Sequence, residues 1–166
     1  MTEFRMTSID ADFGHWDELL KLIQDSFAYM DGIIDPPSSA HHLTIKALQG
    51  KAVVETGFAV FIGDALAGCV FIAEKENHFY LGKLAVAPAF EGRGIARQLM
   101  AKAEQQAVTR GKPVMELQVR IELERNHIVF GRLGYRKVAE TCHPGFTRTT
   151  SITMRKEISR GTDINP

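Results

Sequence analysis

The sequence lacks the long apolar run that a membrane-spanning helix needs. Such a helix takes roughly 20 consecutive apolar residues, and no stretch of the 166 residues approaches that length. The first thirteen residues contain acidic side chains where a secretory signal peptide has its apolar region. Cysteine is also scarce, because Cys69 and Cys142 are too few for a disulfide scaffold or a zinc site of their own. We therefore expect a cytoplasmic protein with no membrane partner and no metal.

The chain has no excess of either charge, with 20 Lys and Arg against 20 Asp and Glu. A nucleic-acid-binding domain is usually strongly basic, so no nucleic-acid partner is expected. The balance hides an asymmetry, because residues 1–50 contain three basic and eight acidic side chains. An acidic N-terminal segment and a basic remainder of the chain suit a cationic substrate on one side of the protein and an anionic ligand on the other.

Length and composition indicate one globular domain over residues 1–166, with 45% hydrophobic and 24% charged residues. Apolar spacing of helical period predicts four helices, over Trp16–Met30, over His41–Gln49 (ended by Gly50), from Ile95 to Ala107, and over Asn126–Leu133. Apolar runs between turn residues predict strands near Phe4–Ser8 and over Phe58–Ile62, Leu66–Ala73, His78–Val86, Val114–Val119, Tyr135–Thr141 and Thr149–Arg155.

The order of these elements predicts an α/β fold with a mixed sheet. Three consecutive strands between residues 58 and 86 are joined by short turns and form an antiparallel meander. The helix after Val86 is long enough to make a crossover, which places the strand Val114–Val119 parallel to its predecessor.

A glycine-rich turn between a strand and a helix is the segment most typical of ligand binding. Gly92 and Gly94 allow a tight turn whose backbone N–H groups point one way, and the helix that follows adds the positive end of its dipole. Such a turn binds phosphate without any side chain. Arg93 and Arg97 add positive charge beside it.

Two familiar phosphate-binding loops do not match this turn. A Walker loop ends in Gly-Lys-Ser/Thr, which is absent. The dinucleotide fingerprint places a third glycine where this chain has Arg97, and it follows its strand directly, whereas five residues separate Val86 from Gly92. A nucleotide-binding α/β domain is therefore the weaker alternative, which NAD binding would support.

The turn instead resembles the coenzyme A-binding motif of the GNAT superfamily of N-acetyltransferases, [RQ]-x-x-G-x-[GA]. Gly94 and Ala96 occupy its last two positions, and Val86-x-Pro88 matches the usual end of the preceding strand. Glu91 departs from the motif, standing where Arg or Gln is expected. Because the contacts in this family come mostly from backbone amides, this substitution bears on affinity more than on binding itself.

A second segment resembles a later motif of the same family, N-x-x-x-Y-x-x-x-G-F. It reads Asn126-x-x-x-Phe130-x-x-x-Gly134-Tyr135 and follows the first motif at the expected distance. The order of elements resembles the GNAT fold over essentially the whole chain. The resemblance thus implies a GNAT-like fold, with a central, mostly antiparallel mixed sheet of six to seven strands flanked by about four helices.

The resemblance implies direct transfer of an acetyl group from acetyl-CoA, the cosubstrate, to a primary amine of a small molecule or peptide. It also implies that the strand before the turn splays from its neighbour and holds the pantetheine arm, with Asn126 contacting the arm and Phe130 near the sulfur. Many relatives form dimers, so a homodimer is compatible with it. The implied coenzyme-binding residues are Leu84, Ala85, Val86, Gly92, Arg93, Gly94, Ile95, Ala96, Arg97, Asn126 and Phe130.

Two catalytic positions of the family differ in this chain. Phe130 replaces the tyrosine that commonly protonates the leaving thiolate, and Gly82 stands where some relatives have a glutamate base. A thiol has a pKa of about 8.5, so a thiolate can leave without that proton near neutral pH. The remaining candidates for the base are Glu116 and His143. The departures at Phe130, Gly82 and Glu91 favour the alternative of a non-catalytic, acyl-CoA-binding regulatory domain.

The acceptor is the least determined part of the interpretation. In the family, the first two helices and their loop wall the acceptor pocket, and here that stretch contains Tyr29, Asp31, Asp35 and the Pro36-Pro37 pair. If the acids face the acceptor, they favour a cation such as a polyamine, an aminoglycoside or a lysine side chain. Acids that merely solvate a loop are the alternative.

Overall fold

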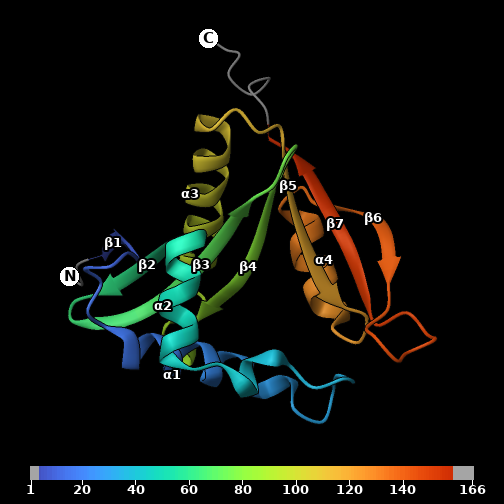
Figure 1. Ribbon diagram of the computed structural model, residues 1–166, viewed down its shortest axis with the longest axis horizontal. Coiled ribbons are helices and arrows are strands. Elements are labelled where there is room, and N and C mark those ends of the chain that lie inside the picture. Colours follow the sequence, from blue (N-terminus) through green and yellow to red (C-terminus); the bar gives the residue numbers. More distant parts are fainter. Residues whose placement is uncertain (1–3, 159–166) are drawn as a thin grey trace.

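The computed structural model describes residues 4–158 and contains every strand and helix that the sequence predicts (Figure 1). The elements are β1 (Phe4–Ser8), α1 (Trp16–Phe27), the short 3₁₀ helices η1 (Ala28–Met30) and η2 (Ser39–His42), α2 (Ile45–Val54), β2 (Thr56–Ile62), β3 (Ala65–Glu74), β4 (Phe79–Val86), η3 (Pro88–Phe90), α3 (Ile95–Thr109), β5 (Val114–Arg120), α4 (Glu124–Arg132), β6 (Arg136–Thr141) and β7 (Ser151–Glu157).

The second helix differs from its predicted bounds. It begins after Thr44, whose hydroxyl oxygen accepts a hydrogen bond from the backbone N–H of Ala47 at 3.1 Å. Gly50 was expected to end it, but it lies inside α2, which continues to Val54. Beyond the glycine, Ala52 packs against the same core cluster as Leu48, and Lys51 forms an ion pair with Glu55 at 2.9 Å. These contacts outweigh the weak helix propensity of one glycine.

The seven strands form one sheet in the order β1-β2-β3-β4-β5-β7-β6. All neighbours are antiparallel except β4 and β5, which are parallel because α3 crosses over between them. The predicted meander and the predicted parallel pair are both confirmed. The last two strands exchange places relative to sequence order, so β7 lies beside β5 and β6 forms the outer edge.

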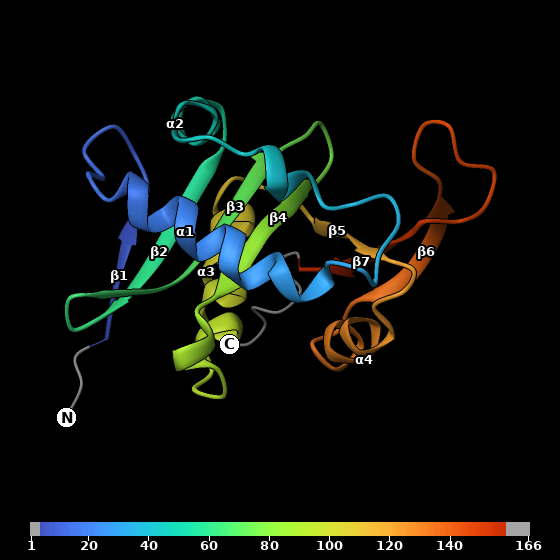
Figure 2. The same ribbon diagram turned by 90° about the horizontal axis from the view of Figure 1, so that it is seen from below.

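Helices cover both faces of the sheet (Figure 2). On one face, α1 and α2 pack on a cluster that includes Phe61, Phe71 and Cys69. On the other, α3 packs on residues that alternate with these along the strands, such as Val60 and Val70. None of the helices that the structure describes is long and apolar enough to cross a membrane.

The approach of α3 to the sheet is closest at Gly68 of β3. A Cβ atom at this position would lie 2.8 Å from Cγ2 of Ile95 and 3.1 Å from Cδ1 of Leu99. Only a glycine therefore lets the first turn of α3 rest directly on β3. This contact fixes the start of α3 beside the end of β4.

Candidate active-site cleft

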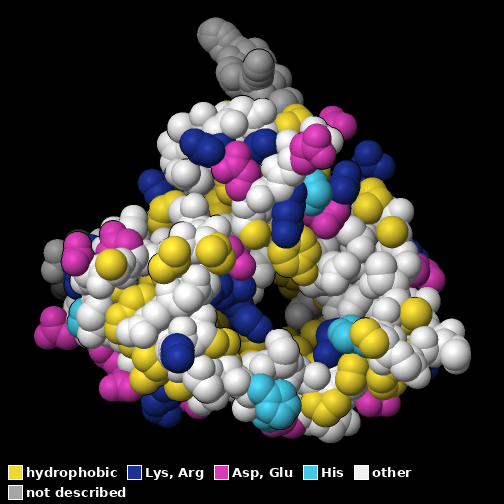
Figure 3. Space-filling view, viewed as in Figure 1, with side chains coloured by type: hydrophobic (Ala, Val, Ile, Leu, Met, Phe, Trp, Pro, Cys, Tyr) yellow, Lys and Arg dark blue, Asp and Glu magenta, His cyan; other side chains and the backbone are white. Residues whose placement is uncertain are grey.

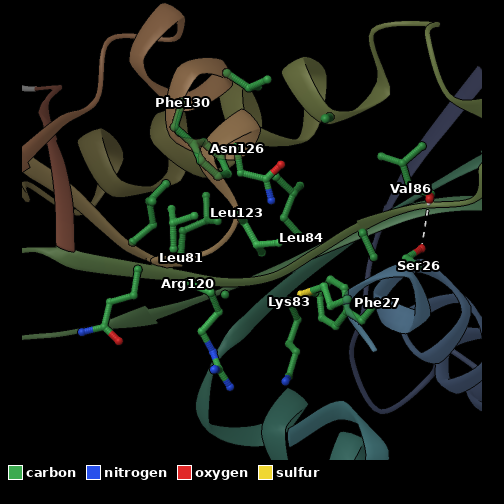
Figure 4. A pocket seen from close by; sticks show the side chains of 18 of the residues that line it. Ser26, Phe27, Leu81, Lys83, Leu84, Val86, Arg120, Leu123, Asn126 and Phe130 are labelled. Atoms are coloured by element: carbon green, nitrogen blue, oxygen red, sulfur yellow. Dashed lines mark hydrogen bonds between the residues drawn. The ribbon is translucent and has the colours of Figure 1, made fainter. Parts of the chain in front are cut away.

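The parallel strands β4 and β5 separate soon after they meet. They are paired only at Phe79 with Met115 and at Tyr80 with Glu116, although β4 continues to Val86 and β5 to Arg120. A cleft of about 470 Å³ lies at this gap, between α3 and α4 on one side and the α1–η2 segment on the other (Figure 4). Its described lining residues are Ser26, Phe27, Tyr29, Met30, Ile34, Ser38, Leu81, Gly82, Lys83, Leu84, Ala85, Val86, Glu91, Ala96, Met100, Leu117, Gln118, Val119, Arg120, Leu123, Asn126, Val129, Phe130 and Leu133.

A bulge in β4 accompanies the separation. Cys69 is paired with Ala85 and Phe71 with Gly82, so β4 contains one residue more than β3 between these pairs. Lys83 in this bulge has a positive φ of 49°. The thiol of Cys69 donates to the carbonyl oxygen of Lys83 at 3.3 Å. Burial raises the pKa of Cys69 to about 12, so the thiol keeps its proton and can hold the bulge.

The glycine turn presents a series of unpaired backbone donors. Among the described residues, the N–H groups from Gly92 to Arg97 donate to no protein acceptor, and the first bond of α3 runs from Gln98 to the carbonyl of Gly94 at 3.1 Å. Gly92 and Gly94 have φ values of 81° and 77°, and the space where their side chains would lie is open. Free N–H groups at a helix start bind phosphate groups well.

Of the predicted coenzyme-binding residues, six line the cleft: Leu84, Ala85, Val86, Ala96, Asn126 and Phe130. The others belong to the turn and the first residues of α3. Ile95 is 2% exposed and packs in the core, so only its backbone N–H remains for a ligand. The side chain of Ala85 is likewise buried, in the cluster under α1.

Two hydrogen bonds connect the walls of the cleft. Asn126 of α4 donates through its amide nitrogen to the hydroxyl of Tyr29 at 3.1 Å. At the other end, the hydroxyl of Ser26 donates to the carbonyl oxygen of Val86 at 2.9 Å (Figure 4). Ser26 was not among the predicted site residues, because its contact joins parts of the chain that are 60 residues apart.

Glu116, one of the two candidate bases, does not line the cleft. Its carboxylate accepts from Nε and Nη2 of Arg155 at 2.8 and 2.7 Å, and it lies 3.6 Å from Nε2 of His78. It lines a separate groove over β5, β7 and β6. Its Oε2 is therefore engaged by the guanidinium of Arg155.

His143, the other candidate, does not line the cleft either. Its backbone N–H donates to Oγ1 of Thr150 at 2.9 Å, and its ring nitrogen Nδ1 contacts the same oxygen. Burial, together with the positive charge of Arg120, lowers the pKa of His143, while Glu122 opposes the shift. The lowered pKa favours the neutral form of the imidazole, which lies within electrostatic range of Arg120, a residue that lines the cleft.

The acids of the loop after α1 do not face the cleft. Asp31 contacts Nε2 of His41 at 2.6 Å, and Asp35 contacts Nη2 of Arg148 at 3.3 Å. Neither carboxylate lines the cleft, whereas Tyr29 does. The acidic acceptor wall that the sequence suggested is therefore not formed.

The cationic side chains that line the cleft are instead Lys83 and Arg120, which sequence reasoning missed. A single cation within a strand belongs to no motif, and the bulge that positions Lys83 has no sequence signal. Among residues 4–158, no group of three or more His, Cys, Asp or Glu side chains lies close enough together to hold a metal ion.

Comparison with known proteins agrees with this architecture. The model of the acetyltransferase (GNAT) family matches residues 16–135, more than half of the chain. The structure is similar to PaiA N-acetyltransferase from Thermoplasma acidophilum in complex with coenzyme A, with a TM-score of 0.79, 14% identity, and coverage of 93% of this chain and 99% of that one. It is also similar to the ribosomal-protein-S18-alanine N-acetyltransferase of Escherichia coli, with a TM-score of 0.72, 18% identity and 99% coverage of both chains. The splayed strands, the open glycine turn and the family match together lead to one conclusion: the chain belongs to the GNAT acetyltransferase family.

Proposed function

We propose that the protein is an N-acetyltransferase that transfers the acetyl group of acetyl-CoA directly to a primary amine of a small molecule or peptide. The observation that carries the proposal is the series of free backbone N–H groups from Gly92 to Arg97, next to a cleft between separated parallel strands. The free donors suit a pyrophosphate, and the gap suits a narrow arm that lies between the strands.

The backbone of β4 supports this use of the cleft. The N–H of Ala87 donates to the carbonyl of Ala67 in β3 at 2.8 Å, so the backbone groups of Ala85 and Ala87 face β3. Because strand residues alternate, the N–H of Val86 faces the gap. There it is a fixed donor for the oxygen on which negative charge develops during acyl transfer. Leu84 and Val86 would hold the arm, and Ser26 fixes the carbonyl of Val86.

When bound, acetyl-CoA supplies an activated acyl group as a thioester. The neutral amine forms a C–N bond with the acetyl carbon, the C–S bond breaks, and the amine gives up a proton. The departing thiolate takes a proton from solvent, because Phe130 has none to give. His143 is the better of the two candidate bases, acting through water, since the carboxylate of Glu116 is engaged by Arg155.

The alternative is a non-catalytic domain that holds acyl-CoA. Two observations favour it: Phe130 lacks a hydroxyl, and neither candidate base lines the cleft. Turnover decides between them, because a regulatory domain binds acetyl-CoA without releasing CoA in the presence of amines.

The test is a calorimetric titration of the purified protein with acetyl-CoA, with NAD in parallel, followed by assay of CoA release with a panel of amines. We expect saturable binding of acetyl-CoA, no heat with NAD, and amine-dependent release of CoA. Binding without release with any amine supports the regulatory domain. Absence of acetyl-CoA binding contradicts both functions.

A further inference from the structure

Two cations extend into the acceptor side of the cleft from the two strands that separate. Lys83 comes from the bulge of β4, and Arg120 is the last residue of β5. Figure 4 shows both side chains extending in the same direction, away from Asn126 and Phe130 and toward α2. In the space-filling view, Lys and Arg side chains lie beside a hollow near the middle of the molecule (Figure 3).

Both cations are anchored by the same short segment before α2. Nζ of Lys83 donates to the hydroxyl of Ser39 at 3.3 Å, and Nη2 of Arg120 donates to the carbonyl of Pro37 at 3.2 Å. These neutral partners orient the two side chains, but they do not neutralise their charge. Both cations therefore contact one short segment, since Pro37 and Ser39 are only two residues apart.

Among the described residues, neither cation has a carboxylate within ion-pair distance, and Nη1 of Arg120 is buried without any hydrogen-bond partner. The acids around them contact other cations, although Oε1 of Glu122 is buried without a hydrogen-bond partner. The contacts are Glu55 with Lys51 at 2.9 Å, Asp35 with Arg148 at 3.3 Å, and Glu122 with Arg148 at 3.7 Å. The one carboxylate that lines the cleft, Glu91, lies at the glycine turn. The acceptor side is therefore a partly buried positive site with an open donor.

A partly buried cation that has no ion-pair partner is stabilised when an anion joins it. Burial lowers the pKa of both Lys83 and Arg120, and the charges of Lys51 and Arg148 add to the respective shifts. Glu55 opposes the shift at Lys83, and Glu122 and Asp35 oppose the shift at Arg120. A guanidinium with one nitrogen already engaged offers its other N–H groups to a carboxylate, and the lysine ammonium adds a second charge.

We propose that Lys83 and Arg120 bind a carboxylate of the acceptor, so that the acceptor is a small amino acid rather than a polyamine. The proposal rests on the N-acetyltransferase function given above. Both cations line the same cleft as Val86 and Phe130, so one small molecule can present its carboxylate to the cations and its amine to the thioester. A free amino acid carries both groups.

The test compares each of the common L-amino acids with its own carboxamide as acceptor, using CoA release at pH 8. For the preferred amino acid we expect at least tenfold higher kcat/KM than for its amide. The comparison is conservative, because the amine of the amide has the lower pKa and is more often neutral at this pH. Equal or faster turnover of the amide overturns the proposal, as does a preference for spermidine over every amino acid.

Two variants connect the preference to the cations. We expect Lys83→Met and Arg120→Gln each to raise KM for the amino acid at least tenfold and to leave KM for the amide unchanged. Arg120→Lys keeps the charge but loses the paired N–H donors of the guanidinium. Its KM for the amino acid should therefore lie between those of the unchanged protein and of Arg120→Gln. The matched control is Lys46→Met on the exposed surface of α2. If Arg120→Gln lowers the melting temperature and affects acid and amide alike, Arg120 has a structural role with Glu122 and the proposal fails.

A binding measurement separates this proposal from the proposed function. The CoA-saturated protein is titrated with the N-acetylated amino acids and with their amides. If acetyl-CoA is not turned over, the transferase function fails, but binding of the acids alone, weakened by Lys83→Met, still supports the carboxylate site. A second outcome is that amino acids and their amides are acetylated equally well and that the N-acetylated acids and amides bind equally well. The transferase function then stands and the carboxylate site is refuted.

Discussion

The amide of Asn126 and the hydroxyl of Tyr29 are joined by a hydrogen bond of 3.1 Å, although 97 residues separate them. The bond links α4 to η1 across the mouth of the cleft. Exposed hydrogen bonds of this kind contribute about 0.5–1.5 kcal/mol. A ligand enclosed by this link should therefore leave more slowly than from a cleft without it.

We expect Tyr29→Phe and Asn126→Ala each to weaken acetyl-CoA binding about two- to tenfold, since each removes one partner of the same bond. In the double variant, the losses should not add, because the bond is already absent in either single variant. Dissociation constants for acetyl-CoA, measured by calorimetry on the unchanged protein, the two single variants and the double variant, give the coupling free energy between Tyr29 and Asn126. Fully additive losses would show that the two side chains act independently.

Replacing Gly94 with alanine should weaken acetyl-CoA binding. A left-handed backbone costs a residue with a side chain roughly 1–2 kcal/mol, and relief of this strain turns the free N–H groups away from a phosphate. The matched control is Gly50→Ala, in the exposed interior of α2 with open space around it, which should stabilise the protein by about 0.5–1 kcal/mol. Urea unfolding and calorimetry measure the two effects. Unchanged acetyl-CoA affinity in Gly94→Ala contradicts the assignment of this turn.

Replacing Gly68 with alanine should destabilise the protein by about 1–3 kcal/mol, because the added Cβ would overlap Ile95 and Leu99. The helix must move away from β3 to make room, and its free N–H groups move with it. We therefore expect a lower melting temperature together with a higher Kd for acetyl-CoA. Normal stability would mean that α3 is less closely packed than the structure has it.

The two cysteines should differ in reactivity. Cys142 is exposed, whereas Cys69 is buried, donates to Lys83, and has its pKa raised to about 12. The thiolate is the reactive form, so iodoacetamide at pH 8 should modify Cys142 alone in the native protein and both residues in urea. Mass spectrometry of peptides distinguishes them. Rapid native modification of Cys69 would show that the bulge opens in solution.

His143 should make the protein less stable in acid. Its pKa in the folded state is below the unfolded value of about 6.5, so between these two pH values the unfolded chain binds more protons. Its contribution to the free energy of unfolding therefore rises with pH through this window and is constant above it. In His143→Gln, the free energy of unfolding should change less between pH 5.5 and 7 than in the unchanged protein, as measured by urea unfolding. The control is His42→Gln, and equal slopes in all three proteins contradict the expectation.

Local patterns in the sequence are sufficient for most of the fold. Apolar residues at helical or strand spacing identify the elements, and the glycine pair at 92 and 94 identifies the turn, because these features depend on neighbours in the chain. Gly50 shows the limit of this reasoning. A helix end depends on whether tertiary contacts, such as those of Ala52, continue past the glycine.

The candidate base and the acceptor side depended on contacts that no local pattern encodes. Glu116 is neutralised by Arg155, its direct partner across the β5–β7 pair, and that pairing follows from the exchange of β6 and β7. Lys83 enters the cleft because of a bulge that is held by a thiol on the next strand. Such positions require the three-dimensional arrangement.

The glycine turn and the gap between β4 and β5 have a consequence for how this fold varies. The proposed contacts to a phosphate and to a pantetheine arm come from peptide groups, which every amino acid except proline supplies in full. A cleft of this kind places few demands on side-chain identity, so its sequence can change without loss of these contacts. The fold itself is shared at identities of only 14% and 18%. Side chains on the opposite wall of the cleft take no part in these proposed contacts, so they are free to change with the acceptor.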